Sequence, residues 1–141
     1  MRMNGSYLLD TNIVIALFAN DSGVLRQLSA ASQIFIPSIV LGELYYGANK
    51  SAHSKSNRIH IDNFALKSVV LVCDTDTARH YGQIKDHLRA KGNPIPENDI
   101  WIAAIAKQYR LTLVSRDKHF QVNKIPRRKQ RGIGGAQNSS S

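Results

Sequence analysis

Short apolar runs of strand length alternate with segments of helical periodicity along most of this 141-residue chain. Strands that are separated by helices pair in parallel, because a parallel connection needs a crossover of a dozen or more residues. The alternation therefore predicts an α/β fold, a three-layer α/β/α sandwich with a central parallel sheet. The expected strands are residues 7–9, 34–36, 69–73 and 111–114, and the expected helices are residues 13–17, 41–47, 54–67, 75–90 and 99–109.

The length and the charge distribution divide the chain into a folded part and a basic end. A chain of this length, 43% of it hydrophobic, holds one core rather than two. The apolar periodicity stops at Lys124, so we expect one domain over residues 1–123 and a disordered basic tail over residues 124–141. Six of the nine net positive charges follow Asp117, where the sequence has no acidic residue. A polyanionic partner such as a nucleic acid suits this tail, and a solvated chain end explains it equally well.

The sequence carries no signal for a membrane protein or for a disulfide-bonded fold. No apolar run approaches the roughly 20 residues that span a bilayer, and the N-terminus lacks the apolar stretch of a signal peptide. Cys73 is the only cysteine, which excludes a disulfide framework and a cysteine-rich zinc site. It lies in an apolar run, so we expect a buried, inert thiol. The protein is therefore expected to be soluble and cytoplasmic.

Four of the ten acidic residues are expected at one edge of the sheet. Asp10 ends the first strand, Glu43 lies one turn into the helix after the second strand, and Asp99 opens the helix before the fourth strand. Asp117 follows the fourth strand by three residues. Because open α/β sheets bind ligands at the carboxyl ends of their strands, these four side chains are candidate catalytic residues.

Each of these acids also has a purely structural explanation. Asp10 and Asp99 suit helix N-caps, and Glu43 suits a solvated helix face. Asp117 suits a turn. Caps and turns do not explain convergence, because neighbouring carboxylates repel one another and raise their pKa values unless cations neutralise them. An oxygen-only cluster favours Mg²⁺ or Mn²⁺, ions that bind phosphates and activate water, so the pattern indicates phosphodiester hydrolysis.

The residues around these acids form four blocks, whose order and spacing are more specific together than any block alone. The blocks are Leu8-Leu9-Asp10-Thr11-Asn12, Leu41-Gly42-Glu43-Leu44-Tyr45-Tyr46-Gly47-Ala48, Pro94-Ile95-Pro96 with Asp99-Ile100-Trp101-Ile102-Ala103-Ala104, and Thr112-Leu113-Val114-Ser115-Arg116-Asp117. Over residues 6–123 the chain thereby resembles the VapC-type toxins of the PIN-domain ribonucleases. The domain expected over residues 1–123 is thus PIN-like.

The resemblance implies an activity, a cofactor and partners. It implies endonucleolytic cleavage of RNA with Mg²⁺ or Mn²⁺, a homodimer, and a cognate antitoxin that occupies the active-site groove. Thr11, Asn12 and Ser115 match positions that orient a carboxylate or a water. The catalytic and metal-binding quartet that it implies is Asp10, Glu43, Asp99 and Asp117.

Basic residues beside and beyond the fourth block are candidate RNA contacts. The family pattern ends soon after His119 and Phe120, so the basic extension from Pro126 is a departure from it. Contacts to phosphates dominate nucleic-acid affinity, which is the role that these cations would have. The candidates are Arg116, Lys118, Arg127, Arg128, Lys129 and Arg131.

Two other functions fit parts of the pattern. A phosphatase or phosphotransferase would use Asp10 as a covalent nucleophile. Against it, Asn12 replaces the aspartate that many such enzymes carry two residues on, and no lysine clearly takes the phosphate-binding role. A non-catalytic, basic RNA-binding module would use the acids only as caps. An Asp10→Asn change separates these functions, because a binding module keeps its activity and a nuclease loses turnover.

An apolar helix face also favours the homodimer. Leu41, Leu44, Tyr45 and Tyr46 follow one another closely on the helix that carries Glu43. Large exposed apolar patches usually mark interfaces, so we expect this face to pack against a second copy of the chain.

Overall fold

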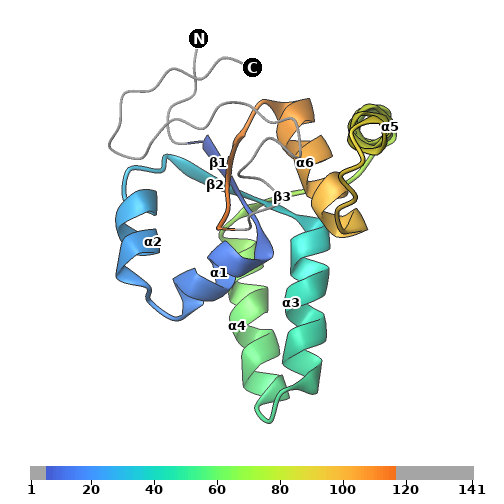
Figure 1. Cartoon of the computed structure of the whole chain (residues 1–141). Coiled ribbons are helices and arrows are strands. Elements are labelled where there is room, and N and C mark those ends of the chain that lie inside the picture. Colours follow the sequence, from blue (N-terminus) through green and yellow to red (C-terminus); the bar gives the residue numbers. More distant parts are fainter. Residues whose placement is uncertain (1–5, 117–141) are drawn as a thin grey trace.

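A parallel sheet of four strands forms the centre of the computed structural model, which describes residues 6–116 (Figure 1). Within these residues six helices surround the sheet, and the strand order is β3-β2-β1-β4. The elements are β1 (Ser6–Leu9), α1 (Thr11–Phe18), α2 (Ser22–Leu28), β2 (Gln33–Pro37), α3 (Ser38–Lys50), α4 (Ser54–Leu66), β3 (Val69–Leu71), α5 (Thr75–Ala90), α6 (Glu97–Tyr109) and β4 (Thr112–Val114). The predicted α/β class and parallel sheet are confirmed. In this described part of the chain, no helix combines the length and apolar character needed to cross a bilayer.

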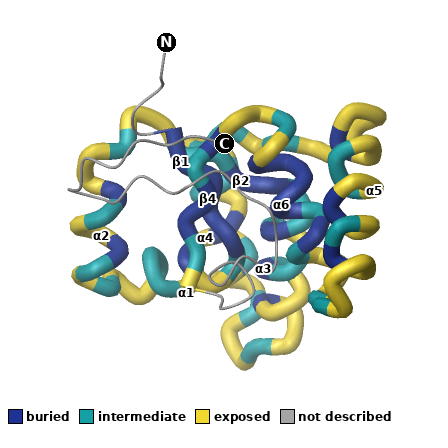
Figure 2. Tube along the Cα trace, turned by 45° about the horizontal axis from the view of Figure 1, so that its top comes forward, coloured by how far each residue is buried: buried dark blue, intermediate teal, exposed yellow. Residues whose placement is uncertain are grey.

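Strand β1 is central and is buried along its whole length. It pairs with β2 through Leu8 and Phe35, and with β4 through Leu8 and Leu113. All four of its side chains are buried, and Leu8 and Leu9 have no exposed surface. Figures 1 and 2 show α5 and α6 on one side of the sheet and α1 and α2 on the other. A parallel strand covered on both faces is apolar throughout, which explains the continuous run in the sequence.

Strand β3 lies at an edge of the sheet, and two predictions are wrong there. The strand ends at Leu71 rather than Cys73, and Val70 and Val72 are 37% and 58% exposed. The Cys73 thiol is exposed rather than buried, because an edge strand has a neighbour on one side only and Cys73 lies beyond its end. Partial desolvation and the nearby Asp74 carboxylate raise the pKa of this thiol. It is therefore a weaker nucleophile at neutral pH than an ordinary cysteine.

Helix α2 is an element that the sequence pattern did not predict. Only Val24 and Leu28 of its seven residues are buried, so its apolar periodicity is a single i, i+4 pair. Its N-cap is Asp21, whose Oδ1 accepts a hydrogen bond of 3.1 Å from the backbone N–H of Val24. One cap and one apolar pair are too short a pattern to distinguish a helix from a loop.

Helix α6 is buried on most sides, and it begins earlier than predicted. It starts at Glu97 directly after Pro96, so Asp99 lies within the first turn and the prediction that Asp99 opens and caps the helix is wrong. Proline suits the start of a helix, because its fixed φ is already helical and its missing N–H is not needed there. The earlier start brings Asn98 into the helix beside Asp99. The buried residues are Ile100, Ile102, Ala103, Ala104, Ile105 and Ala106.

Helices α3 and α4 form a hairpin that projects away from the sheet (Figure 1). Leu44 of α3 and Ile61 of α4 are buried in the core. The Tyr45 hydroxyl donates a hydrogen bond to Asp62, which joins the two helices and raises the pKa of Tyr45. Of the four side chains expected to face a second copy, only Tyr46 is exposed, by 65%. Leu44 is buried, and Leu41 and Tyr45 pack against the core with part of their surface exposed.

Replacing Leu8 by alanine should destabilise the fold strongly, whereas the same change at Leu66 should not. Leu8 is fully buried in β1, and Leu66 is 84% exposed on α4. A truncated core side chain leaves a cavity, which lowers the free energy of unfolding by about 2–5 kcal/mol, and an exposed site changes it by less than about 0.5 kcal/mol. Urea unfolding followed by circular dichroism measures both values. Equal effects of the two changes would contradict the central position of β1.

Candidate active site

An open pocket of about 440 Å³ lies beside the carboxyl end of β1. Three of the four acids predicted for the site line it, and so does Asn12. The fourth acid, Asp117, lies outside the residues that the structure describes. The full lining is Asp10, Thr11, Asn12, Glu43, Pro96, Glu97, Asn98, Asp99 and Ile102. Residues that are up to 92 positions apart in the sequence, from Asp10 to Ile102, therefore meet at this edge of the sheet.

Asp10 is 4% exposed and has a hydrogen-bond donor on each carboxylate oxygen. Its Oδ1 accepts a hydrogen bond of 3.0 Å from the backbone N–H of Ile13, which makes it the N-cap of α1. Its Oδ2 accepts a hydrogen bond from the hydroxyl of Ser115, directly after β4. A buried carboxylate is tolerated because such donors replace water. The same side chain therefore serves as a helix cap and as part of the pocket.

Glu43 is held at both carboxylate oxygens by side chains of two other helices. The hydroxyl of Thr11, at the start of α1, donates to Oε1. The amide of Asn98, in the first turn of α6, donates to Oε2 over 3.3 Å. Glu43 is thus no freely solvated helix residue, because its carboxylate joins α1, α3 and α6 at the pocket.

Asn98 is a pocket residue that the sequence did not identify. Like Asp99, it does not cap α6, because Pro96 holds that position. The sequence feature that could have identified Asn98 is its position directly before Asp99, at the start of a helix. In the structure this first turn lies beside Glu43. An amide at that point can donate to a carboxylate without adding a charge to the site.

The first turn of α6 is also fastened to α5. The carboxylate of Glu97 accepts a hydrogen bond from the Tyr81 hydroxyl and pairs with the Lys85 ammonium over 2.9 Å. These two donors hold the pKa of the Glu97 carboxyl below its ordinary value. The Tyr81 ring stacks on Trp101 of α6 with ring centroids 4.0 Å apart. The two residues before Asp99, Glu97 and Asn98, are therefore fixed to other elements.

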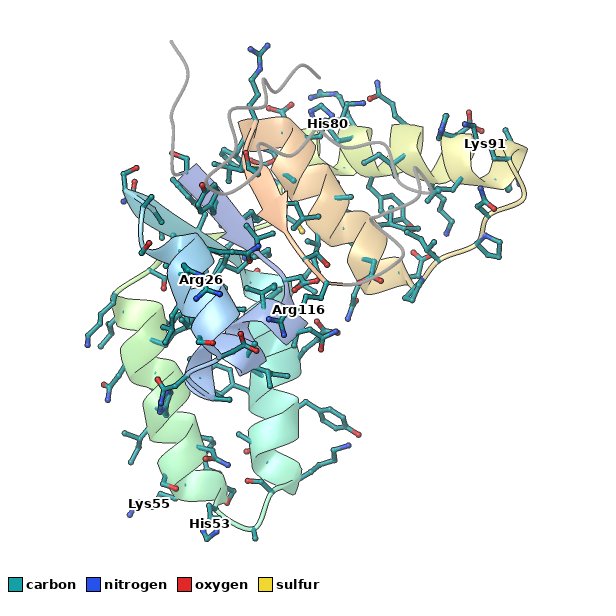
Figure 3. The ribbon with its side chains drawn as sticks, turned by 60° about the vertical axis from the view of Figure 1, so that its left-hand side comes forward. Arg26, His53, Lys55, His80, Lys91 and Arg116 are labelled. Atoms are coloured by element: carbon teal, nitrogen blue, oxygen red, sulfur yellow. The ribbon has the colours of Figure 1, made fainter. Side chains whose placement is uncertain are left out.

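Arg116, predicted to bind RNA, forms an ion pair within the chain. Its Nη2 lies 3.1 Å from Oδ1 of Asp21, the N-cap of α2, and Figure 3 shows it close to that helix. Two contacts lower the pKa of the Asp21 carboxyl. The hydrogen bond from the backbone N–H of Val24 has the larger effect, and the contact with Arg116 adds to it. This contact fastens the segment after β4 that carries Ser115. The other predicted RNA contacts, Lys118, Arg127, Arg128, Lys129 and Arg131, lie outside the described residues.

The donor chemistry of the pocket fits a hard divalent cation. Carboxylates of Asp10, Glu43 and Asp99 and amides of Asn12 and Asn98 offer oxygen ligands. Within residues 6–116 no three histidine, cysteine or acidic side chains are close enough to hold an ion directly. Mg²⁺ does not require three, because it retains several waters and commonly uses one or two carboxylates. The described residues therefore fit an ion of this kind.

Comparisons with known proteins agree with this fold. The family model for the PIN domain matches residues 7–125. Ribonuclease VapC2 of Haemophilus influenzae is 40% identical over 111 residues, which are 77% of this chain and 84% of that protein. The tRNA(fMet)-specific endonuclease VapC of Shigella flexneri is 35% identical over 111 residues, with the same shares of 77% and 84%.

A solved structure extends the match to three dimensions. The crystal structure of DNA-bound VapBC from Salmonella typhimurium superposes with a TM-score of 0.76 at 32% identity, over 86% of this chain and 92% of that one. The architecture is thus that of a PIN domain. The chain belongs to the PIN-domain family and, within it, to the VapC ribonucleases.

Replacing Tyr81 by phenylalanine or Lys85 by glutamine should raise the pKa of Glu97 toward its ordinary value. Each change removes a donor that favours the carboxylate. Because the folded-state pKa is lowered, the contact stabilises the fold above the ordinary pKa of glutamate, and the stabilisation is lost as the pH falls through the lowered pKa. NMR titration of the side-chain carboxyl carbon measures the pKa. Arg79→Gln is the control, since Arg79 pairs with Asp76 on the same helix. A Glu97 pKa that stays low in both variants would refute these contacts.

Proposed function

We propose that this chain is a Mg²⁺- or Mn²⁺-dependent endoribonuclease and the toxin of a toxin–antitoxin pair. The observation that carries the proposal is the meeting of Asp10, Glu43 and Asp99 in one pocket, from three separate parts of the chain. Relatedness to the VapC ribonucleases supports the same activity. Asp117 completes the proposed quartet through the resemblance of its sequence block.

In this proposal the acidic side chains would hold the ion, and the ion would attract the scissile phosphate to the pocket. When bound, the ion supplies positive charge for the scissile phosphate and for the charge that develops in the transition state. The hydroxyls of Thr11 and Ser115 and the amide of Asn98 keep the carboxylates in place, since each donates to one of their oxygens. Preorganised carboxylates need no rearrangement when the substrate arrives.

A protein antitoxin is the proposed partner. The related structure from Salmonella typhimurium is of VapBC. In this chain a second, mostly apolar hollow of about 390 Å³ adjoins the pocket, because Glu43 lines both. Its apolar lining includes Ile15, which is 52% exposed, and Phe18. Exposed apolar surface beside an active site favours a protein partner that covers both.

The phosphotransferase alternative fits the geometry less well. Asp10 would have to attack phosphorus directly, and this residue is 4% exposed, with both carboxylate oxygens accepting hydrogen bonds. A covalent nucleophile must reach phosphorus in line with the leaving group, which burial hinders, whereas a largely covered carboxylate can still hold a cation. The burial of Asp10 therefore favours a role in holding a cation.

Asp10→Asn and Asp99→Asn should each reduce RNA cleavage about a thousandfold or more, because the site then loses charge that holds the ion. Asparagine keeps the shape of the side chain and can still cap α1, so the fold should remain. Purified protein is incubated with cellular RNA in Mg²⁺, in Mn²⁺ or in EDTA, and the fragments are quantified on gels. EDTA should stop the reaction and either metal should restore it.

The matched control for these variants is Asp86→Asn, which makes the same chemical change at an exposed position of α5. Its cleavage rate should equal that of the unaltered chain. Full activity of Asp10→Asn, or of the unaltered protein in EDTA, would contradict the proposed site.

The homodimer stays a prediction, with Tyr46 as the exposed residue of its proposed face. Light scattering should give twice the 15.7 kDa mass of one chain. Tyr46→Ser should shift the equilibrium toward monomer, because interfaces depend on buried aromatic side chains. Tyr109→Ser, a change at another exposed tyrosine, is the control. A mass of one chain at every concentration would rule the dimer out.

A further inference from the structure

The turn that joins α3 to α4 is strongly basic. We define the hairpin tip as residues 49–58, whose cationic or imidazole side chains are Lys50, His53, Lys55 and Arg58. No acidic residue occurs between Glu43 and Asp62. Figure 3 shows His53 and Lys55 at the far end of the hairpin, away from the sheet. In the hairpin, the acidic residues Glu43 and Asp62 thus lie nearer the sheet than the cations of the tip.

Ion pairs within the described part of the protein do not neutralise these cations. In residues 6–116 none of them belongs to an ion pair, and Arg58 makes one neutral contact, a hydrogen bond of 3.2 Å to the side-chain oxygen of Asn49. Lys55 lies in the first turn of α4, where the helix dipole disfavours positive charge. Lys50 and Lys55 are both exposed. Arg58 is half-buried, so a ligand can reach the charges of Lys50 and Lys55 fully and that of Arg58 in part.

One face of α3 connects the pocket to the tip. Glu43, Tyr46 and Lys50 are spaced i, i+3 and i+7, so they lie along the same side of the helix. At a rise of 1.5 Å per residue, Lys50 is about 10 Å along the helix from Glu43. The Lys50 ammonium lies 4.5 Å from the centroid of the Tyr46 ring, which holds it along this path. Gly47 lies between Glu43 and Lys50 in this helix. A Cβ built on Gly47 would meet no atom within 4 Å, so the helix surface is open at this point.

We propose that the hairpin tip is an RNA-binding surface, which holds the phosphate backbone of the substrate outside the cleavage pocket. This inference rests on the proposed function. A strand that follows the roughly 10 Å between Glu43 and Lys50 brings its phosphates past the cations of the tip. Lys50, Lys55 and Arg58 bind these phosphates, and the RNA strand is cleaved in the pocket.

The composition of the tip favours RNA over an acidic protein. Protein interfaces centre on apolar and aromatic anchors that are fully buried in the complex. Residues 49–58 contain one apolar side chain, Ala52, among lysine, arginine, histidine, serine and asparagine. Cations surrounded by hydroxyl and amide groups are typical of contacts to phosphate and sugar.

The test measures RNA binding separately from cleavage. A fluorescein-labelled RNA stem-loop is titrated with protein in EDTA, which prevents metal-dependent turnover, and anisotropy gives the Kd at several salt concentrations. The triple variant Lys50→Gln, Lys55→Gln and Arg58→Gln should bind about tenfold or more weakly, with a shallower salt dependence, because fewer counterions are released. With Mg²⁺ present its KM should rise and its kcat should hold, since none of the three lines the pocket.

A second triple variant provides the matched control. Lys67→Gln, Lys91→Gln and Lys107→Gln remove the same three charges from exposed positions outside the tip. If position matters and not only net charge, this variant binds RNA within about twofold of the unaltered chain and keeps its salt slope. Circular dichroism of both variants checks that the helices persist.

The outcomes separate this inference from the proposed function. Equal weakening by the two triple variants would overturn the tip as an RNA surface, even if the unaltered protein cleaves RNA. Tighter binding of a polyglutamate peptide than of RNA, lost in the tip variant, would overturn it in favour of an acidic protein. An unaltered chain that cleaves no RNA with Mg²⁺ or Mn²⁺ would refute the proposed function alone, because the binding comparison in EDTA still decides the tip.

Discussion

A buried carboxylate at the end of β1 is the constraint on which the pocket depends. Asp10 loses its water on folding, and the N–H of Ile13 and the hydroxyl of Ser115 replace it. The Ile13 N–H fixes where α1 starts, and the Ser115 hydroxyl fixes the position of the segment that follows β4. Because these segments follow neighbouring strands, the need to satisfy one charge fixes the spacing of the chain at this edge of the sheet.

The first turn of α6 completes the pocket from the opposite side. Asp99 follows two residues that are each fastened elsewhere, Glu97 to α5 and Asn98 to Glu43 of α3. Its backbone position is therefore set by contacts that do not use its own carboxylate. A site that must accept a cation and a phosphate benefits from such support, because ligands held by neighbours lose little freedom on binding.

The features that periodicity could predict are those that repeat over several residues. The buried run ending at Leu9 and the acid that follows it were visible, as were the helices that carry Glu43 and Asp99. Helix α2 was missed because one cap and one apolar pair make no period. The thiol of Cys73 was misjudged because an apolar run does not tell an edge strand from a central one. Of the two partners of Glu43, Thr11 was indicated by the family resemblance, whereas Asn98, 55 positions away, was beyond the sequence.

The sequence by itself determined the α/β class, the parallel sheet and the edge at which the acids gather. These follow from local rules, because alternating strands and helices permit few connections and strand ends point to one edge. Only the tertiary structure decided which donors hold each carboxylate, that Arg116 pairs with Asp21, and that the α3–α4 hairpin places His53 and Lys55 at its far end, away from the sheet (Figure 3). The reason is that hydrogen bonds and ion pairs depend on distances of a few ångströms between side chains, and packing of the whole chain sets those distances.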